Sequence, residues 1–220
     1  MCGRIAQHRY QQSFLDPLGL DLLAVTDNPL GRYNVAPRTL VWSITGGKEN
    51  PSAQSLRWGW APHWAKGKPP AINARAETIW TSRYWSAARK NRLLIPADGW
   101  FEWVAEEGKQ PYYIHSATDA PLYFAAIGVF DLLSNEEREG DGFAIVTGGA
   151  EGGMVDIHDR RPLALPPELA LEWLDSATPQ DRVEELVASG GLGPESFRWH
   201  RVDRAVGNVR NQGAHLIEPI

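Results

Sequence analysis

Cys2 has the most distinctive potential chemistry of any residue in this chain. It is the only cysteine among 220 residues, and it directly follows Met1. Methionine is usually removed when the second side chain is this small, and its removal would leave an α-amine and a thiol on one carbon. These groups titrate near about 7.7–8.0 and about 8.5, so both are partly available as nucleophiles at neutral pH. The amine can condense with an aldehyde, and the sulfur can then close a thiazolidine ring. The alternative is a terminal residue without a function, since chain ends are commonly frayed.

Two other residues could move protons. Glu102 stands between Trp100 and Trp103 in Trp100-Phe101-Glu102-Trp103. If this segment is a strand, Trp100 and Glu102 share a face, and an aromatic face should raise the pKa of a carboxyl. The alternative is an ordinary glutamate facing solvent. His158 precedes an acid and two arginines, a pattern that suits phosphate contact and proton transfer, although a single histidine is more often structural.

The segments that must position these residues are expected to be mostly short strands. Sixteen prolines and 21 glycines indicate many turns. The apolar patterns predict strands at 40–44, 53–60, 93–104, 111–114, 122–130, 143–147, 163–165 and 197–202. They predict helices at 8–15, 72–90, 167–174 and 179–188. We therefore expect an α+β fold, mostly antiparallel, with a twisted sheet closed into a barrel-like core and helices at its periphery.

Asn73 lies near the start of the predicted helix 72–90. Asparagine is a common N-cap, so the simplest interpretation of Asn73 is a helix cap. The loop at 61–71 contains Lys66 and Lys68, which either face nucleic acid or are solvated.

Charge is distributed unevenly along the chain. The net charge is −5, but residues 1–104 hold 13 Lys and Arg against 7 Asp and Glu, whereas residues 105–220 hold 9 against 20. Eight of the ten tryptophans also lie in the first 104 residues. Cations and flat aromatic rings are what proteins use to bind single-stranded nucleic acid. The alternative is that the tryptophans fill the core and that the charge asymmetry has no function.

Several classes of protein are not supported by the sequence. One cysteine excludes an internal disulfide framework and a cysteine-based zinc cluster. The chain has no run of 18 apolar residues and no charged-then-apolar start, so we expect no membrane span and no signal peptide. We expect a cytoplasmic protein without a metal or a cofactor.

Six blocks of sequence together resemble the SRAP family, the SOS-response-associated peptidases. They occur in the order of that family and span essentially the whole chain, so the resemblance implies one domain over residues 1–220. The blocks are Cys2-Gly3-Arg4, Tyr33-Asn34-Val35-Ala36-Pro37, Arg57-Trp58-Gly59-Trp60-Ala61-Pro62, Asn73-Ala74-Arg75-Ala76-Glu77-Thr78, Pro96-Ala97-Asp98-Gly99-Trp100-Phe101-Glu102-Trp103 and His158-Asp159-Arg160-Arg161-Pro162.

The resemblance implies a reaction and roles for four residues. Family members crosslink covalently to abasic sites in single-stranded DNA and so shield the lesion. By similarity, Cys2 supplies the amine and the sulfur, and Asn73 hydrogen-bonds the adduct. Glu102 assists ring opening and proton transfer, and His158 orients and protonates the sugar oxygen.

The same resemblance implies contacts to DNA. Three arginines match phosphate-binding positions of the family: Arg4, Arg75 and Arg160. Two tryptophans, Trp64 and Trp103, could stack near the lesion. Arg161 stands where many members have methionine, and an additional cation there is compatible with DNA binding. We therefore expect a monomer that binds single-stranded DNA carrying abasic sites and is associated with the nucleoid when bound. Two alternatives are an N-terminal-cysteine autopeptidase or hydrolase and a non-covalent single-strand binding module.

Overall fold

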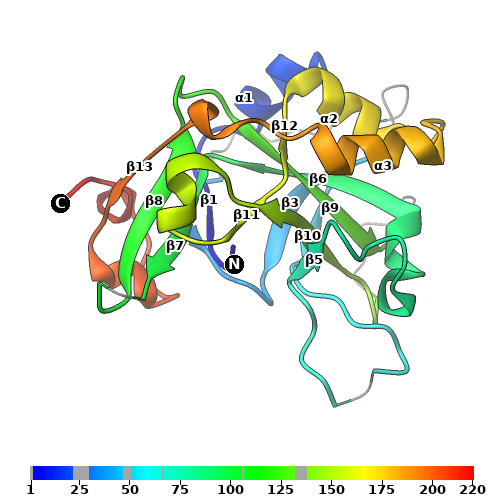
Figure 1. Cartoon of the computed structure of the whole chain (residues 1–220), viewed down its shortest axis with the longest axis horizontal. Coiled ribbons are helices and arrows are strands. Elements are labelled where there is room, and N and C mark those ends of the chain that lie inside the picture. Colours follow the sequence, from blue (N-terminus) through cyan, green and yellow to red (C-terminus); the bar gives the residue numbers. More distant parts are fainter. Residues whose placement is uncertain (1, 22–29, 47–50, 66, 106, 132–137) are drawn as a thin grey trace.

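The computed structural model describes residues 2–21, 30–46, 51–65, 67–105, 107–131 and 138–220. Strands dominate, and the helices are few and short (Figure 1). The strands are β1 (Ile5–Gln7), β2 (Arg32–Val35), β3 (Leu40–Thr45), β4 (Ser52–Arg57), β5 (Asn73–Arg75), β6 (Asn91–Ala97), β7 (Gly99–Val104), β8 (Gln110–Ser116), β9 (Leu122–Val129), β10 (Gly142–Gly149), β11 (Arg160–Pro162), β12 (Ala164–Leu165) and β13 (Phe197–Arg201). The α-helices are α1 (Gln11–Leu15), α2 (Pro167–Leu174) and α3 (Gln180–Ser189).

Short 3-10 helices connect many of these elements. They are η1 (Asp16–Leu18), η2 (Arg83–Trp85), η3 (Ala88–Lys90), η4 (Gly152–Asp156), η5 (Pro194–Ser196), η6 (Arg204–Gly207) and η7 (Ala214–Leu216).

The described strands form two sheets. One has the order β13-β8-β7-β1-β2, and the other has the order β11-β10-β9-β6-β3-β4, with β12 paired to β9 and β5 paired to β10. The pairs between these strands are antiparallel, apart from the parallel pair of β5 and β10. The α+β, mostly antiparallel prediction is confirmed. Each strand order has two free ends within the described chain, so the barrel is not closed, contrary to that part of the expectation.

Apolar side chains fill the space between the two sheets. Ile5 and Trp100 come from the first sheet, and Phe124 and Ile145 come from the second. Cys2 belongs to the same cluster and is fully buried. The predicted nucleophile therefore lies where the two sheets meet.

The outer faces of the sheets are covered differently. α2 and α3 pack on the second sheet, with buried residues spaced as on one side of a helix, such as Ala170, Trp173 and Leu174 of α2. Figure 1 shows the two helices side by side. The outer face of the first sheet is covered by the C-terminal segment, through Val206 and Leu216.

The prediction of a helix at 72–90 is wrong. Residues 73–75 form β5, which pairs with Ile145–Thr147 of β10, and the backbone N–H of Ala76 still donates to Thr147. Turns and the short 3-10 helices η2 and η3 follow. Tertiary packing explains the difference. Ile79 and Trp85 pack in the core beneath the second sheet, and this packing outweighs the local helical pattern of the sequence. Asn73 is consequently a strand residue and not a helix cap.

Candidate active site at Cys2

Asn73 is hydrogen-bonded to the N-terminal segment. Its Nδ2 donates to the carbonyl oxygen of Cys2 over 2.9 Å. The pairing of β5 with β10 sets Asn73 opposite Ile145 and so fixes the position of the amide. Cys2 itself precedes β1, whose Ile5 pairs with Trp100 of β7 and with Val35 of β2. Segments from β2, β5 and β7, distant from one another in sequence, thus hold the N-terminal segment that carries Cys2.

Glu102 acts electrostatically on Cys2. Burial raises the pKa of the Cys2 thiol well above its usual value, and the negative charge of Glu102 raises it further. Glu102 is itself 3% exposed, on β7 opposite Tyr112. Burial raises the pKa of Glu102 to about 7, so both of its protonation states are populated at neutral pH. The sequence-based expectation of a raised carboxyl pKa is therefore supported.

His158 follows η4 and faces two competing partners. Its Nδ1 lies 2.7 Å from Oδ1 of Asp159 and accepts the backbone N–H of Arg160 over 3.0 Å. The first contact requires a proton on Nδ1, and the second requires a lone pair. Burial lowers the pKa of His158, which favours the neutral ring, and the Asp159 side chain is 81% exposed and can turn into water. We therefore assign the ring proton to Nε2.

A narrow crevice joins these groups. Its polar lining comes from Glu102, His158, Trp100, Arg160 and Arg161, and its apolar lining comes from Ile114, Met154 and Ile157. A titratable carboxyl and a titratable imidazole thus share one crevice beside the N-terminal segment, an arrangement suited to acid–base chemistry.

The guanidinium groups of Arg160 and Arg161 have partners within the protein. Arg160 binds the carboxylate of Glu77 through both terminal nitrogens, over 2.6 and 3.0 Å, and also donates to the carbonyl of Thr147. Arg161 donates to the carbonyl of Leu192. Glu77 was not predicted as a site residue, although it lies in the quoted block around Asn73.

Arg4 is buried rather than presented at the surface. It is 8% exposed, and its Nη1 donates to Oδ1 of Asn34 and to the carbonyl of Val206 over 2.7 Å. The guanidinium also lies 5.6 Å from the ring centroid of Trp103. These contacts hold the N-terminal segment between β2 and the C-terminal segment, a positioning role that the sequence did not reveal.

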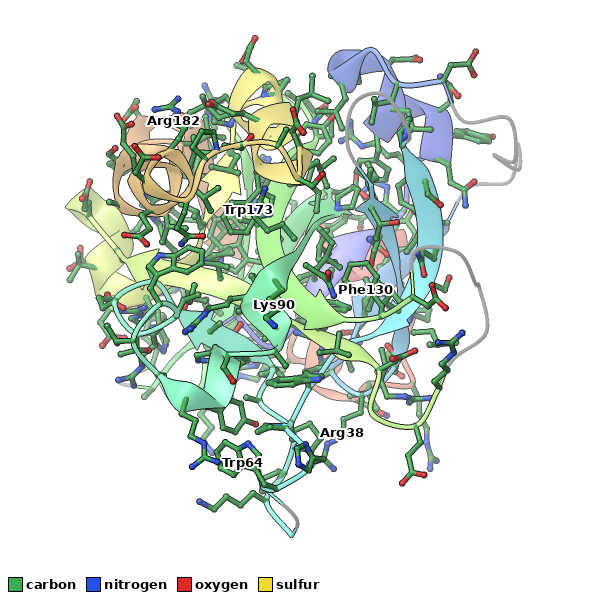
Figure 2. All side chains as sticks on the ribbon, turned by 90° about the vertical axis from the view of Figure 1, so that its right-hand side faces the viewer. Arg38, Trp64, Lys90, Phe130, Trp173 and Arg182 are labelled. Atoms are coloured by element: carbon green, nitrogen blue, oxygen red, sulfur yellow. The ribbon has the colours of Figure 1, made fainter. Side chains whose placement is uncertain are left out.

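Arg75 and Trp64 are the predicted DNA-binding residues that are exposed. Arg75 lies at the end of β5, and Trp64 is 47% exposed. Arg83 lies 5.5 Å from the Trp64 ring centroid, and Tyr84 meets that ring edge-on. Figure 2 shows Trp64 at the opposite end of the molecule from Arg182 of α3. Lys68 is exposed, and Lys66 lies outside the described residues.

The structure brings Cys2, Asn73 and Glu102 together and places His158 in the crevice with Glu102. Within the described part of the chain, Trp64 makes no hydrogen bond, ion pair or ring contact with these four residues. The predicted DNA contacts of Arg4, Trp64, Arg75, Trp103, Arg160 and Arg161 stay predictions. The described residues include no group of three or more His, Cys, Asp or Glu placed to hold a metal ion. No described helix is long and apolar enough to cross a membrane.

Comparison with known proteins identifies close relatives. Residues 1–209 match the model of the SRAP family, SOS response associated peptidase. The chain is 45% identical to the abasic site processing protein YedK of Escherichia coli, over the full length of both chains. It is 28% identical to the abasic site processing protein YoaM of Bacillus subtilis, covering 99% of this chain and 98% of that protein.

The fold also has a close counterpart among solved structures. A phage-related protein from Bordetella bronchiseptica superposes with a TM-score of 0.77 at 41% identity, covering 92% of this chain and 95% of the other.

Proposed function

Because this chain belongs to the SRAP family, whose full-length relatives are abasic site processing proteins, we propose that it recognises abasic sites in single-stranded DNA and captures them covalently through Cys2. One observation carries the proposal. Asn73 holds the Cys2 carbonyl, and the charge of the buried Glu102 acts on the Cys2 thiol. An amide and a carboxyl from separate strands are thus arranged around the one residue able to provide an aminothiol.

The proposed reaction requires removal of Met1. The α-amine of Cys2 adds to the open-chain aldehyde of the abasic sugar and gives a carbinolamine. Its hydroxyl is protonated and leaves as water, which produces an imine. The Cys2 sulfur then attacks the imine carbon, the thiol proton passes to the nitrogen, and a thiazolidine forms. One water is released overall. Ring closure protects an imine that would otherwise hydrolyse.

Glu102 and His158 carry the protons in this proposal. With a pKa of about 7, Glu102 can take a proton from the attacking amine and return it to the departing hydroxyl. The neutral His158 ring, with its proton on Nε2, can donate to the sugar oxygen. Asn73 fixes the Cys2 backbone, and Arg4 anchors the same segment from the other side. Reversal would use the same groups in the opposite order.

DNA binding is proposed to be electrostatic and aromatic. Arg75 is exposed beside the site and can contact a phosphate, and the exposed ring of Trp64 can stack on an unpaired base. Arg160, Arg161, Arg4 and Trp103 complete the proposed set, partly through the structural contacts that orient them. We expect the protein to act as a monomer in the cytoplasm and to associate with the nucleoid when bound to DNA.

The test is denaturing gel electrophoresis with single-stranded DNA that carries one abasic site. The wild-type protein should give a heat-resistant band of low mobility. Cys2→Ala should give none but should still retard the DNA on a native gel. Cys2→Ser is the matched control: both variants keep the α-amine, but the serine hydroxyl replaces the thiol as a weaker nucleophile for ring closure, so any product should be a heat-labile imine.

Absence of the band for wild-type protein, with Met1 shown to be absent by intact mass, would contradict the proposal. That result would favour an N-terminal-cysteine autopeptidase or hydrolase, or a non-covalent single-strand binding module.

A further inference from the structure

The crevice beside Cys2 contains polar groups that the proposed proton transfers do not use. Trp100 and Glu102 are two residues apart on β7, so their side chains share the face that meets the second sheet. Arg160 and Arg161 of β11 also line the crevice. The crevice is narrow: it has no room for a nucleobase, and a substrate group would enter it only by displacing part of its lining.

Three N–H donors of this crevice lack a hydrogen-bond acceptor among the residues that the structure describes. They are Nε1 of Trp100, Nε of Arg160 and Nε of Arg161. Trp100 is fully buried, so bulk water does not solvate its indole N–H. A buried donor without an acceptor destabilises a fold and calls for an explanation.

Two other fully buried indoles of this protein do have acceptors. Nε1 of Trp58 donates to the carbonyl of Ile72 over 2.9 Å, and Nε1 of Trp173 donates to the carbonyl of Leu93 over 3.0 Å. All three rings are 0% exposed. The fold therefore satisfies the indoles of Trp58 and Trp173 with backbone oxygens, whereas that of Trp100, in the crevice, is left without one.

We propose that the Trp100 N–H donates a hydrogen bond to the oxygen on the substrate's aldehyde carbon, which becomes the carbinolamine hydroxyl and leaves as water. This inference rests on the proposed function. A buried N–H donor without an acceptor favours an oxygen acceptor, and Glu102 in the same crevice can protonate that oxygen as the carbon–oxygen bond breaks. The nitrogen lone pair of Cys2 forms the C=N bond, and the released water carries away the oxygen. Trp100 changes no bond itself; it orients the departing oxygen.

Trp100→Phe removes the indole N–H but keeps an aromatic ring, so it tests the hydrogen bond separately from the packing. A phenyl ring can keep edge contacts with Phe124 and Phe197, which now meet the Trp100 ring at 5.8 and 5.3 Å between centroids. Trp173→Phe is the matched control, because it removes an indole whose N–H has an acceptor and which belongs to the core cluster on the other face of the second sheet.

The decisive comparison uses two unreactive DNA analogues. One carries a borohydride-reduced abasic site, which keeps a hydroxyl on the former aldehyde carbon. The other carries a tetrahydrofuran abasic analogue, which lacks it. Trp100→Phe should lose about tenfold in affinity for the reduced site, which corresponds to one hydrogen bond, and nothing for tetrahydrofuran. The crosslinking rate should also fall by about tenfold or more. Trp173→Phe should change neither the affinity ratio nor the rate.

The outcomes separate the two claims. Failure of wild-type protein to crosslink would overturn the proposed function, whatever Trp100 does. Wild-type crosslinking together with an unchanged affinity ratio in Trp100→Phe would overturn this inference alone. The ratio is measured within one preparation and does not depend on the folded fraction. If Trp100→Phe does not fold, Trp100→Leu provides the same comparison.

Discussion

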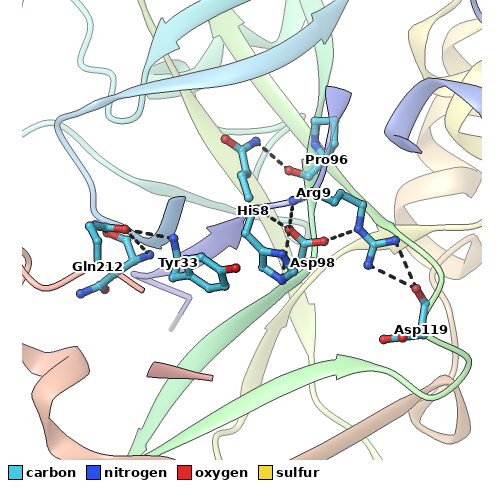
Figure 3. Close-up of polar contacts among 9 residues, drawn as sticks. His8, Arg9, Tyr33, Pro96, Asp98, Asp119 and Gln212 are labelled. Atoms are coloured by element: carbon cyan, nitrogen blue, oxygen red, sulfur yellow. Dashed lines mark hydrogen bonds and ion pairs between the residues drawn. The ribbon is translucent and has the colours of Figure 1, made fainter. Parts of the chain in front are cut away.

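The polar groups near the two ends of β1 differ in their hydrogen-bonding and in their pKa values. Beyond its C-terminal end, the buried carboxylate of Asp98 accepts the backbone N–H groups of His8 and Arg9 and also binds the Arg9 guanidinium (Figure 3). The guanidinium reaches on to the carbonyl of Asp119, over 3.3 and 3.2 Å. His8 stacks on Tyr33 with a centroid distance of 4.6 Å.

Before its N-terminal end, β1 leads to Cys2 and the crevice. There the pKa values of the Cys2 thiol and the Glu102 carboxyl are raised by burial, and the Trp100 N–H has no acceptor among the described residues. A strand of three residues thus connects a region of paired charges with one where burial raises the pKa of two titratable groups and an indole N–H has no acceptor among the described residues. Satisfied groups stabilise the fold, whereas groups kept unsatisfied can interact with a substrate.

Asp98→Ala should have the largest effect on stability. It leaves the Arg9 guanidinium and two backbone N–H groups without their acceptor, at a site where the Asp98 side chain is 1% exposed. We expect a loss of about 4 kcal/mol in the free energy of unfolding, measured by urea denaturation. The folded fraction should still crosslink at the wild-type rate. A stable but inactive variant would show that the two ends of β1 are not functionally distinct.

Stability should fall as pH rises through the titration of Glu102. Its pKa in the folded protein is raised to about 7, so between about pH 4.3 and that value the folded state holds a proton that the unfolded state has released. The stabilisation from this proton is complete below about pH 4.3 and is lost as pH rises through about 7, by up to about 4 kcal/mol. Urea denaturation at a series of pH values tests this. Glu102→Gln should lack this pH-dependent component, so identical pH profiles for the two proteins would exclude Glu102 as its origin.

Glu102→Gln should also slow crosslinking by about 100-fold at neutral pH, because it removes the group that transfers protons during imine formation. Its stability at pH 8 should equal or exceed that of the wild type. Single-turnover rates on denaturing gels give the readout. A wild-type rate would transfer the proton-carrying role to His158, and the His158→Ala variant would then be the one that is slowed.

Arg75→Ala should have the smallest effect. Arg75 is exposed, so we expect only a modest loss of non-covalent affinity and a decrease of about 0.7 in the slope of log K against log salt for single-stranded DNA. Arg182→Ala on α3 is the control, since Arg182 is paired with Glu172 and Glu185 and should not contact DNA. Equal salt slopes for all three proteins would remove Arg75 from the DNA interface.

Much of the fold could be predicted because its signals are local. α2 matches its predicted bounds and α3 nearly does, whereas the strand predicted at 93–104 is divided into β6 and β7 at Asp98. Residues 72–90 could not be assigned correctly, since β5 exists only through its pairing with the distant strand β10. The open ends of the two sheets likewise depend on pairings that no local pattern specifies.

The candidate site, like the fold, could be predicted from the sequence only in part. The residue types and the family resemblance predicted roles for Cys2, Asn73, Glu102 and His158, and the pKa of Glu102 is raised as its neighbours suggested. The burial of Arg4 against Asn34 could not be foreseen, because it depends on where the C-terminal segment returns. Trp100 shares a face with Glu102 in the sequence pattern, but only three-dimensional packing reveals that its N–H lacks a partner.

The most direct test of covalent capture is mass spectrometry of the crosslinked product after trypsin and nuclease digestion. The account predicts that the adduct lies on the peptide Cys2-Gly3-Arg4, without Met1, with the mass of the sugar aldehyde fragment added and one water lost. Resistance to borohydride would distinguish the thiazolidine from an open imine. An adduct on a lysine, or on a peptide that retains Met1, would contradict the proposal that the Cys2 aminothiol performs the reaction.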